Sequence, residues 1–254
     1  RRAAFKPPVA FSAMRYALAL EYDGRAFCGF QSQREGCGVQ DALEAAVSAI
    51  AGERIVVTAA GRTDTGVHAA FQVVHFDTRV NRPLTAWVRG VNSHLPLGVA
   101  VLWAREVSED FHARFAATQR GYRYVLLNHP VPPGINQGMI GWHHRPLDAD
   151  AMNRAASHLI GQHDFSAFRA AQCQARSPVK ELRLARIERR NDFLFCDFRA
   201  DGFLHHMVRN LMGCLVHIGS GRQSPEWMNE ILVGRDRTRA APTFDAAGLY
   251  LSHI

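Results

Sequence analysis

The sequence predicts an α+β fold made of two ferredoxin-like halves related by a pseudo-two-fold axis. The main observation is the order of the predicted elements, which reads β-α-β-β-α-β and then repeats with one extra helix. The second is size, because 254 residues that are 47% hydrophobic can bury a substantial core. We expect the two sheets to join edge to edge into one mixed, mainly antiparallel sheet. Helices should cover one side and leave a central active-site cleft on the other.

The first half begins with a strand over residues 14–22, where apolar and other residues alternate up to the turn pair Asp23-Gly24. Apolar residues at helical spacing, among them Val39, Leu43 and Val47, then predict a helix over 39–51. The rest of this half is predicted as strands over 54–58 and 71–76, a helix over 83–94 and a strand over 99–103.

The second half repeats this order. Its elements are predicted as a strand over 122–128, a helix over 148–160, strands over 181–189 and 193–198, helices over 203–218 and 225–233, and a strand over 248–251. The pattern divides the chain into a loose extension over 1–13, an N-terminal half over 14–120 and a C-terminal half over 121–254.

The chain is basic, with a formal net charge of +7 and a pI near 9.6. Such a balance fits a polyanionic partner, since basic side chains that neutralise phosphates favour nucleic-acid binding. Of the 30 basic residues, 28 are Arg, which suits stacking on bases and bidentate phosphate contacts in RNA. A general arginine excess that reflects genomic composition is the alternative.

The five cysteines are odd in number and form no C-x-x-C pair, which predicts reduced thiols in a cytoplasmic protein. The first thirteen residues lack the apolar stretch of a secretion signal, and no run is long enough to span a bilayer.

A glycine-bounded loop joins two predicted strands of the first half and reads GRTDTG, residues 61–66. Gly61 and Gly66 can take backbone angles that are closed to other residues, so a tight loop can present Asp64 beside Arg62. The loop predicts a presented acid, whereas the simpler interpretation is a turn or capping aspartate.

The strand that opens the second half reads RGYRYV, residues 120–125, and partly matches the pattern of RNA-recognition domains. Arg123 replaces the small fourth residue and Leu127 the last aromatic. Tyr122 is either a stacking platform for a base or an ordinary half-buried strand tyrosine. A noncatalytic RNA-binding protein is therefore a second hypothesis.

In the predicted helix over 203–218, His205 and Arg209 are four residues apart and share a face that suits a phosphate or a carboxylate. Solvent-facing residues of an amphipathic helix are the alternative. The pairs His143-His144 and His205-His206 have neither H-E-x-x-H spacing nor cysteine partners, so no metal is predicted. No nucleotide-binding fingerprint appears, so no cofactor is predicted.

Four motifs in this order resemble the bacterial tRNA pseudouridine synthase A family: GRTDTGVHA, RGYRY, FLHHMVRNLMG and AAPTFDAAGLYL, from about residue 14 to the end. The resemblance implies an isomerase that converts uridine to pseudouridine without a cofactor. It makes Asp64 the catalytic nucleophile, which attacks C6 of the uracil or C1′ of the ribose. It assigns Arg209 as the partner that keeps this carboxylate ionised.

The same resemblance implies roles for three other residues. Arg62 fills the space left by the flipped target base. Tyr122 packs on the flipped uracil, and proton removal from C5 is its weaker role because a phenol has a pKa of about 10. Leu249 forms an apolar wall of the uracil pocket, or is a plain core leucine.

The resemblance implies a homodimer whose substrate is the anticodon arm of tRNA, around nucleotides 38 to 40, recognised by shape and phosphate contacts. A third hypothesis, an aspartate-dependent glycosidic hydrolase, is disfavoured because the loop motif offers no second carboxylate to protonate a leaving group.

Overall fold

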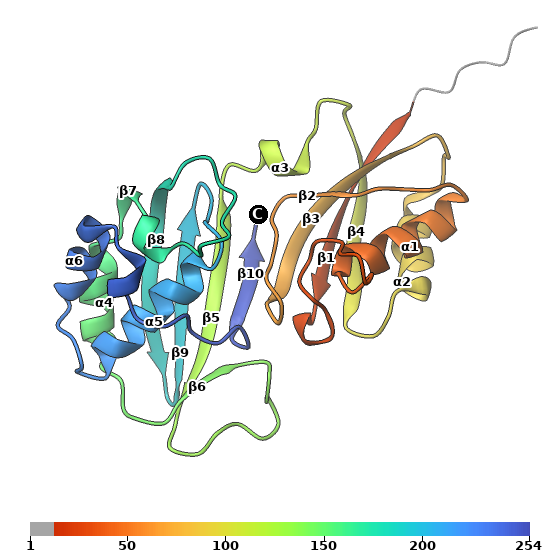
Figure 1. The fold of residues 1–254 in the computed structure, drawn as a ribbon. Helices are drawn as coiled ribbons and strands as arrows, with labels where there is room; N and C mark the ends of the chain where they lie inside the picture. The colour runs from red at the N-terminus through yellow and green to blue at the C-terminus, as the bar shows by residue number, and fades with distance from the viewer. Residues whose placement is uncertain (1–12) are drawn as a thin grey trace, which may run out of the picture.

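The computed structural model describes residues 13–254 (Figure 1), so of the predicted extension over 1–13 all but the last residue lies outside the described residues. The strands are β1 Met14–Tyr22, β2 Thr58–Ala59, β3 His68–Thr78, β4 Val99–Val107, β5 Arg120–Asn128, β6 Gly141–His143, β7 Gly161–Asp164, β8 Val179–Arg190, β9 Phe193–Ala200 and β10 Leu249–His253. The helices are α1 Val39–Ala51, α2 Val91–His94, α3 Ala113–Ala116, α4 Ala149–Ser157, α5 Met207–Gly219 and α6 Trp227–Gly234, with a π-helical turn over Ala86–Gly90 before α2. None of these helices combines the length and apolar character needed to cross a membrane.

All ten strands belong to one sheet of order β4-β1-β3-β10-β5-β9-β8-β7, with β2 paired to β3 and β6 paired to β5. The first half runs β4-β1-β3-β2 and the second β10-β5-β9-β8. When the four strands of each half are numbered in chain order, they lie side by side in the order four, one, three, two in both halves. This repeat confirms the predicted fold of two ferredoxin-like halves.

Strand β10 joins the halves (Figure 1). It pairs with β5 in antiparallel register and with β3 in parallel register, where Tyr250 meets His68. Strand β2 pairs further along the same strand, opposite Val74 and His75. Strands β2 and β10 thus pair with the same edge of β3. The result is the predicted mixed, mainly antiparallel sheet.

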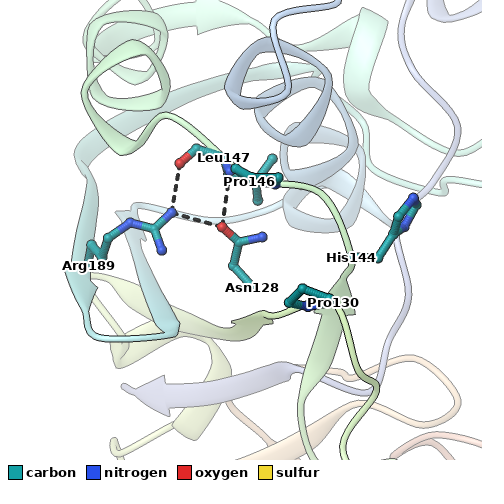
Figure 2. A pocket seen from close by; sticks show the side chains of 6 residues that line it. All are labelled: Asn128, Pro130, His144, Pro146, Leu147 and Arg189. Atoms are coloured by element: carbon teal, nitrogen blue, oxygen red, sulfur yellow. Dashed lines mark hydrogen bonds between the residues drawn. The ribbon is translucent and has the colours of Figure 1, made fainter.

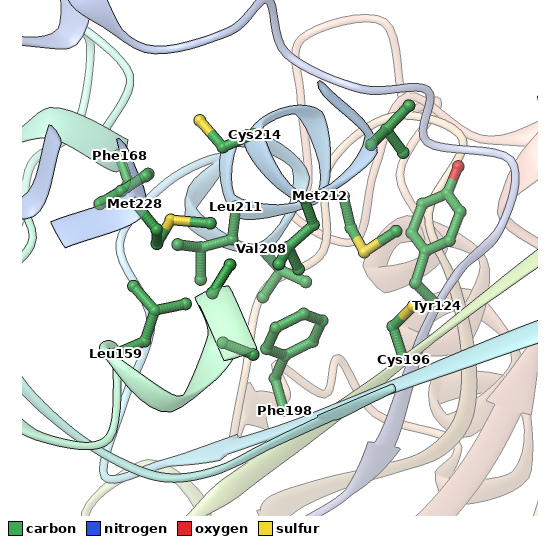
Figure 3. Close-up of a cluster of buried hydrophobic side chains, with 14 of the residues drawn as sticks. Tyr124, Leu159, Phe168, Cys196, Phe198, Val208, Leu211, Met212, Cys214 and Met228 are labelled. Carbon is green, nitrogen blue, oxygen red and sulfur yellow. The ribbon is translucent and has the colours of Figure 1, made fainter. Parts of the chain in front are cut away.

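The helices of both halves cover the same face of the sheet. Leu249 lies opposite Tyr124, and Leu251 lies opposite Tyr122, so all four side chains leave the sheet on one side. Leu249 belongs to the core that α4, α5 and α6 complete (Figure 3), and Leu251 to the core completed by α1 and α2. Tyr122 packs against both cores, which places it at the seam between the two groups of helices.

Strand β2 is shorter than the predicted strand over 54–58. The backbone amides of Ile55 and Val57 donate to side chains of α1, Ser48 at 2.9 Å and Glu44 at 3.0 Å, and so make no ladder bonds there. The short elements α3, β6 and β7 were not predicted.

The cysteine prediction is wrong for two of the five residues, because Cys28 and Cys37 form a disulfide with their Cα atoms 5.4 Å apart. The amide of Cys28 also donates to the carbonyl of Cys37 at 2.9 Å. This backbone pairing of a long loop brings together two residues whose spacing gave no signal. The other three cysteines are free thiols, as predicted.

Candidate functional site

Asp64 lies in the connection between β2 and β3, on the loop that the sequence singled out. Gly66 has φ +77°, and the amide of Val67 donates to the carbonyl of Asp64 at 3.1 Å, which closes a tight turn directly after the acid. Of the two glycines that can take such backbone angles, Gly66 does so and Gly61 does not. A side-chain carbon at Gly61 would make ordinary contact with Leu251 at 3.6 Å, and its φ lies outside the left-handed range.

The loop is held through its own backbone. Four consecutive carbonyl oxygens accept hydrogen bonds from other elements: Ala60 from Arg120, Gly61 from Gln72 at 2.7 Å, Arg62 from the Tyr122 hydroxyl at 3.3 Å, and Thr63 from the Phe30 amide at 3.0 Å. Donors from both halves thus fix the path of the chain into Asp64, so the carboxylate is presented by a rigid support.

The side chain of Thr63 anchors the loop to β1. It is buried and forms a 2.8 Å hydrogen bond with the hydroxyl of Tyr22 at the end of β1. Gly29 has φ +101°, and a side-chain carbon there would lie 2.8 Å from the carbonyl oxygen of Thr63. The segment after Cys28 therefore approaches the loop as closely as a glycine permits.

Three basic side chains surround the Asp64 carboxylate, which is 22% exposed. Nε2 of His205 is 3.2 Å from Oδ1, Nε2 of His206 is 3.6 Å from Oδ2, and Nη1 of Arg209 is 3.9 Å from Oδ2. The predicted pair of Asp64 and Arg209 is brought together, and the two histidines are nearer still. The carboxylate thus lies in a setting of basic side chains.

The backbone just before α5 explains how both histidines reach the acid. His206 has φ +62°, and α5 starts only at Met207, so the helix predicted from residue 203 begins four residues later. A left-handed residue interrupts a right-handed helix. Adjacent residues of a continuous helix face different directions, whereas this turn lets His205 and His206 face one carboxylate. The sequence signal that could have identified these contacts is the pair of adjacent histidines shortly before Arg209.

Arg209 is fixed by the segment that precedes β10. Its Nε donates to the carbonyl of Phe244 at 2.8 Å, and the amide of Phe244 donates back to the carbonyl of Arg209 at 3.1 Å. The neighbouring Asn210 is fully buried, donates to the carbonyl of Phe168 at 2.7 Å and accepts from the hydroxyl of Thr243 at 2.7 Å. These contacts, which sequence reasoning missed, orient the first turn of α5.

Tyr122 lies beside the loop, with its ring edge-on to Phe203 at 5.1 Å between centroids. Burial, followed by the negative charge of Asp64, raises the pKa of the Tyr122 phenol above its usual value near 10. The phenol therefore stays protonated at neutral pH and offers a flat ring.

The two remaining predicted residues lie in different surroundings. The side chain of Arg62 is exposed and makes no hydrogen bond or ion pair within residues 13–254. Leu249 is 4% exposed and packs in the core of the C-terminal half. The site thus gathers Asp64, Arg209 and Tyr122 on the face covered by helices, in the seam between the two groups. From the sequence, we expect the site on the face of the sheet without helices, and this expectation is wrong because these residues lie on the helix-covered face.

Asp64, His205 and His206 offer ligand atoms within 4.8 Å of one another, a separation that a metal ion could bridge. The guanidinium of Arg209 contributes a permanent positive charge at the same carboxylate and opposes a cation there. We therefore assign no metal to these residues.

A separate hollow of about 270 Å³ lies between the end of β5 and the segment before α4 (Figure 2). Two of its polar side chains are paired, since Nη2 of Arg189 donates to Oδ1 of Asn128 at 2.9 Å and to the carbonyl of Leu147 at 2.7 Å. None of the predicted site residues lines it.

The chain is similar to known proteins over nearly its whole length. A family model described as tRNA pseudouridine synthase matches residues 18–116 and 155–254. A protein of Thiobacillus denitrificans named tRNA pseudouridine synthase A is 78% identical over 241 residues, which are 95% of this chain and 93% of that protein. Proteins of the same name from Dechloromonas aromatica and Chromobacterium violaceum are 59% and 58% identical, over 93% and 95% of this chain and 90% and 92% of theirs.

Proposed function

Since this chain belongs to the tRNA pseudouridine synthase family, we propose that it acts on the anticodon arm of tRNA through Asp64 as nucleophile and without a cofactor. The predicted enzyme class, an isomerase converting uridine to pseudouridine in tRNA, is confirmed by this membership. The proposed target positions are the uridines around nucleotides 38 to 40. The observation that carries the proposed mechanism is the half-buried Asp64 carboxylate, held on a rigid loop among three basic side chains.

The proposed reaction begins when the target nucleotide leaves the stack, which costs roughly a few kcal/mol. Arg62 occupies the vacated space, a role supported by its exposed side chain, which has no polar partner among the described residues. The ring of Tyr122 stacks on the flipped uracil. The carboxylate of Asp64 attacks C6 or C1′, the bond between N1 of the uracil and C1′ of the ribose breaks, and a bond forms between C1′ and C5. Arg209 places its positive charge beside the attacking carboxylate, and Leu249 lines the uracil pocket.

The proposed recognition of tRNA depends on shape and phosphate contacts, which agrees with 28 arginines in the chain. We further propose that the protein is a cytoplasmic homodimer in which one tRNA touches both subunits, and that residues 14–120 and 121–254 are its two structural halves. Light scattering of the free protein, and of its mixture with tRNA, tests the dimer.

The two other hypotheses are less well supported. A noncatalytic RNA-binding protein gains nothing from a carboxylate in its RNA site, since the charge repels phosphate. A retaining glycosidase needs a second carboxyl group about 5 Å away, whereas the charged contacts of Asp64 among the described residues are all basic.

The test is release of tritium from tRNA that carries 5-tritiated uridine, without added cofactor. The wild-type protein should release tritium, and Asp64→Asn should release none while still binding tRNA. Asp192→Asn is the matched control, because this aspartate is exposed in the turn between β8 and β9 and its side chain has no polar partner among the described residues. A wild-type protein without activity, or an active Asp64→Asn variant, would refute the proposal.

A further inference from the structure

The reaction requires a base that the residues named so far do not supply. When C1′ has joined C5, that carbon still carries its hydrogen, and the product forms only when this proton leaves. We propose that His205 is the general base that accepts the C5 proton. This assignment rests on the function proposed above.

The step balances without any further reactant. The C5–H bond breaks, its electron pair forms the C5=C6 double bond of the product, and the proton passes to Nε2 of His205. The displaced pair either releases the carboxylate of Asp64 from C6 or takes a proton at N1, depending on the carbon that Asp64 attacked. Because N1 gains the one proton that C5 loses, the imidazolium can return its proton to N1 or to water.

The position of His205 suits this step for either attacked carbon. Its Nε2 lies 3.2 Å from Oδ1 of Asp64. If Asp64 attacks C6, it is joined to the carbon next to C5; if it attacks C1′, C5 has just displaced it from C1′. In both cases C5 lies next to the carboxylate and therefore close to this nitrogen. General bases act across about 2.6–3.2 Å. The imidazole is 39% exposed and thus remains accessible to the substrate.

The backbone of His205 is fixed by hydrogen bonds, and its ring is supported by a neighbouring ring. Its carbonyl accepts from the amide of Ala170 at 3.0 Å, and its amide donates to Sγ of Cys173 at 3.5 Å. The ring lies against that of His206, with centroids 4.1 Å apart. A base on such a support keeps one orientation through the reaction.

Other groups near the carboxylate are poorer bases for C5. The phenol of Tyr122 has a raised pKa and already donates to the carbonyl of Arg62. Burial lowers the pKa of His206, which weakens it as a proton acceptor. Arg209 has no acceptor atom. Imidazole as a class titrates near pH 6.5, close to the pH at which a base is most effective.

The charged and titratable groups that gather around His205 exert opposing effects. The carboxylate of Asp64 contributes a negative charge, whereas Arg209 and a protonated His206 contribute positive charges. Cys173 faces the backbone of His205 from the neighbouring loop. The carboxylate is the nearest charged group to Nε2, so a proton accepted by this nitrogen lies beside a negative charge.

The test uses the full chain, a tRNA with 5-tritiated uridine and a second tRNA with 5-deuterated uridine. His205→Gln should lower single-turnover tritium release about 100-fold or more while tRNA binding is retained. Deuterium at C5 should slow this variant more than it slows the wild type, and free imidazole should restore part of the activity of His205→Ala. His94→Gln is the control, because His94 is exposed at the end of α2 and makes no side-chain hydrogen bond or ion pair within residues 13–254.

The outcomes separate this inference from the proposed function. If the wild type releases no tritium, the proposed function itself fails. If the wild type is active and His205→Gln releases tritium at a similar rate, His205 is not the base. A large loss without a deuterium effect and without imidazole rescue would also overturn the assignment, since it would mark a positioning residue.

Discussion

The buried hydrogen bond between Tyr22 and Thr63 should be a main support of the loop that carries Asp64. Tyr22 is 4% and Thr63 6% exposed, and their hydroxyl oxygens are 2.8 Å apart. Burial raises the pKa of Tyr22, so its hydroxyl keeps its proton. Gln72 also faces this hydroxyl, but its amide is engaged with Gly61. Thr63→Val therefore leaves a buried hydroxyl without its partner.

The expected cost of Thr63→Val is the desolvation of one buried hydroxyl, about 1–3 kcal/mol. For a chain of this size, that corresponds to a fall of about 2–12 °C in the midpoint of thermal unfolding. Tyr22→Phe removes the other partner. The double variant should lose less than the sum of the single losses, with an interaction energy of about 1 kcal/mol, because no hydroxyl is then stranded.

The assay is urea unfolding of the wild type, both single variants and the double variant, followed by circular dichroism and by the fluorescence of the fully buried Trp87. Tritium release is measured on the same four proteins. The Thr63→Val variant should release tritium more slowly, because a loosened Thr63 also loosens the position of its neighbour Asp64. If Thr63→Val unfolds within about 0.5 kcal/mol of the wild type, or if the two losses are simply additive, the reasoning is refuted.

Two further predictions concern backbone fit and pH. Gly29→Ala should slow tritium release and destabilise the protein by more than about 1 kcal/mol, because a methyl group would lie 2.8 Å from the carbonyl of Thr63. Gly36→Ala, at φ +66° with open space around it, should cost only the backbone strain and leave activity intact; equal effects in both variants would count against close packing as the cause. Burial lowers the pKa of His75, His143, His206 and His217. Because the unfolded chain then binds more protons, thermal stability should decrease as the pH falls below about 6.5 and level off once the folded histidines are protonated. Melting curves from pH 8 to 5 measure this, with a smaller decrease expected for His143→Gln, and a flat profile in the wild type would contradict it.

Local periodicity was sufficient for most of the fold. The helix predicted over 39–51 has the same bounds as α1, and the alternating residues 14–22 coincide with β1. The spacing of apolar residues in α1 reports its one buried face directly, whereas β1 buries both faces, among them Leu18 and Ala19. The loop around Asp64 was also found from its glycines, its charge and the two strands beside it.

Contacts between segments that are distant in the sequence could not be predicted from local patterns. The pairing of Cys28 with Cys37, the left-handed turn at His206 and the insertion of β10 between β3 and β5 each depend on backbone atoms that meet only in the folded chain. The resemblance named Asp64, Tyr122 and Arg209, but not their spacing.

The sequence by itself determined that two β-α-β-β-α-β halves form, and that an aspartate stands on a glycine-bounded loop between strands, because both properties follow from residues close together in the chain. Only the tertiary structure decided which side chains surround that aspartate. His205, His206 and Arg209 start more than 140 residues away, and they reach the carboxylate because β10 joins the halves while the left-handed His206 turns the start of α5 toward the loop. The chemistry of the carboxylate depends on those charges, and their distances are set by packing across the seam between the halves.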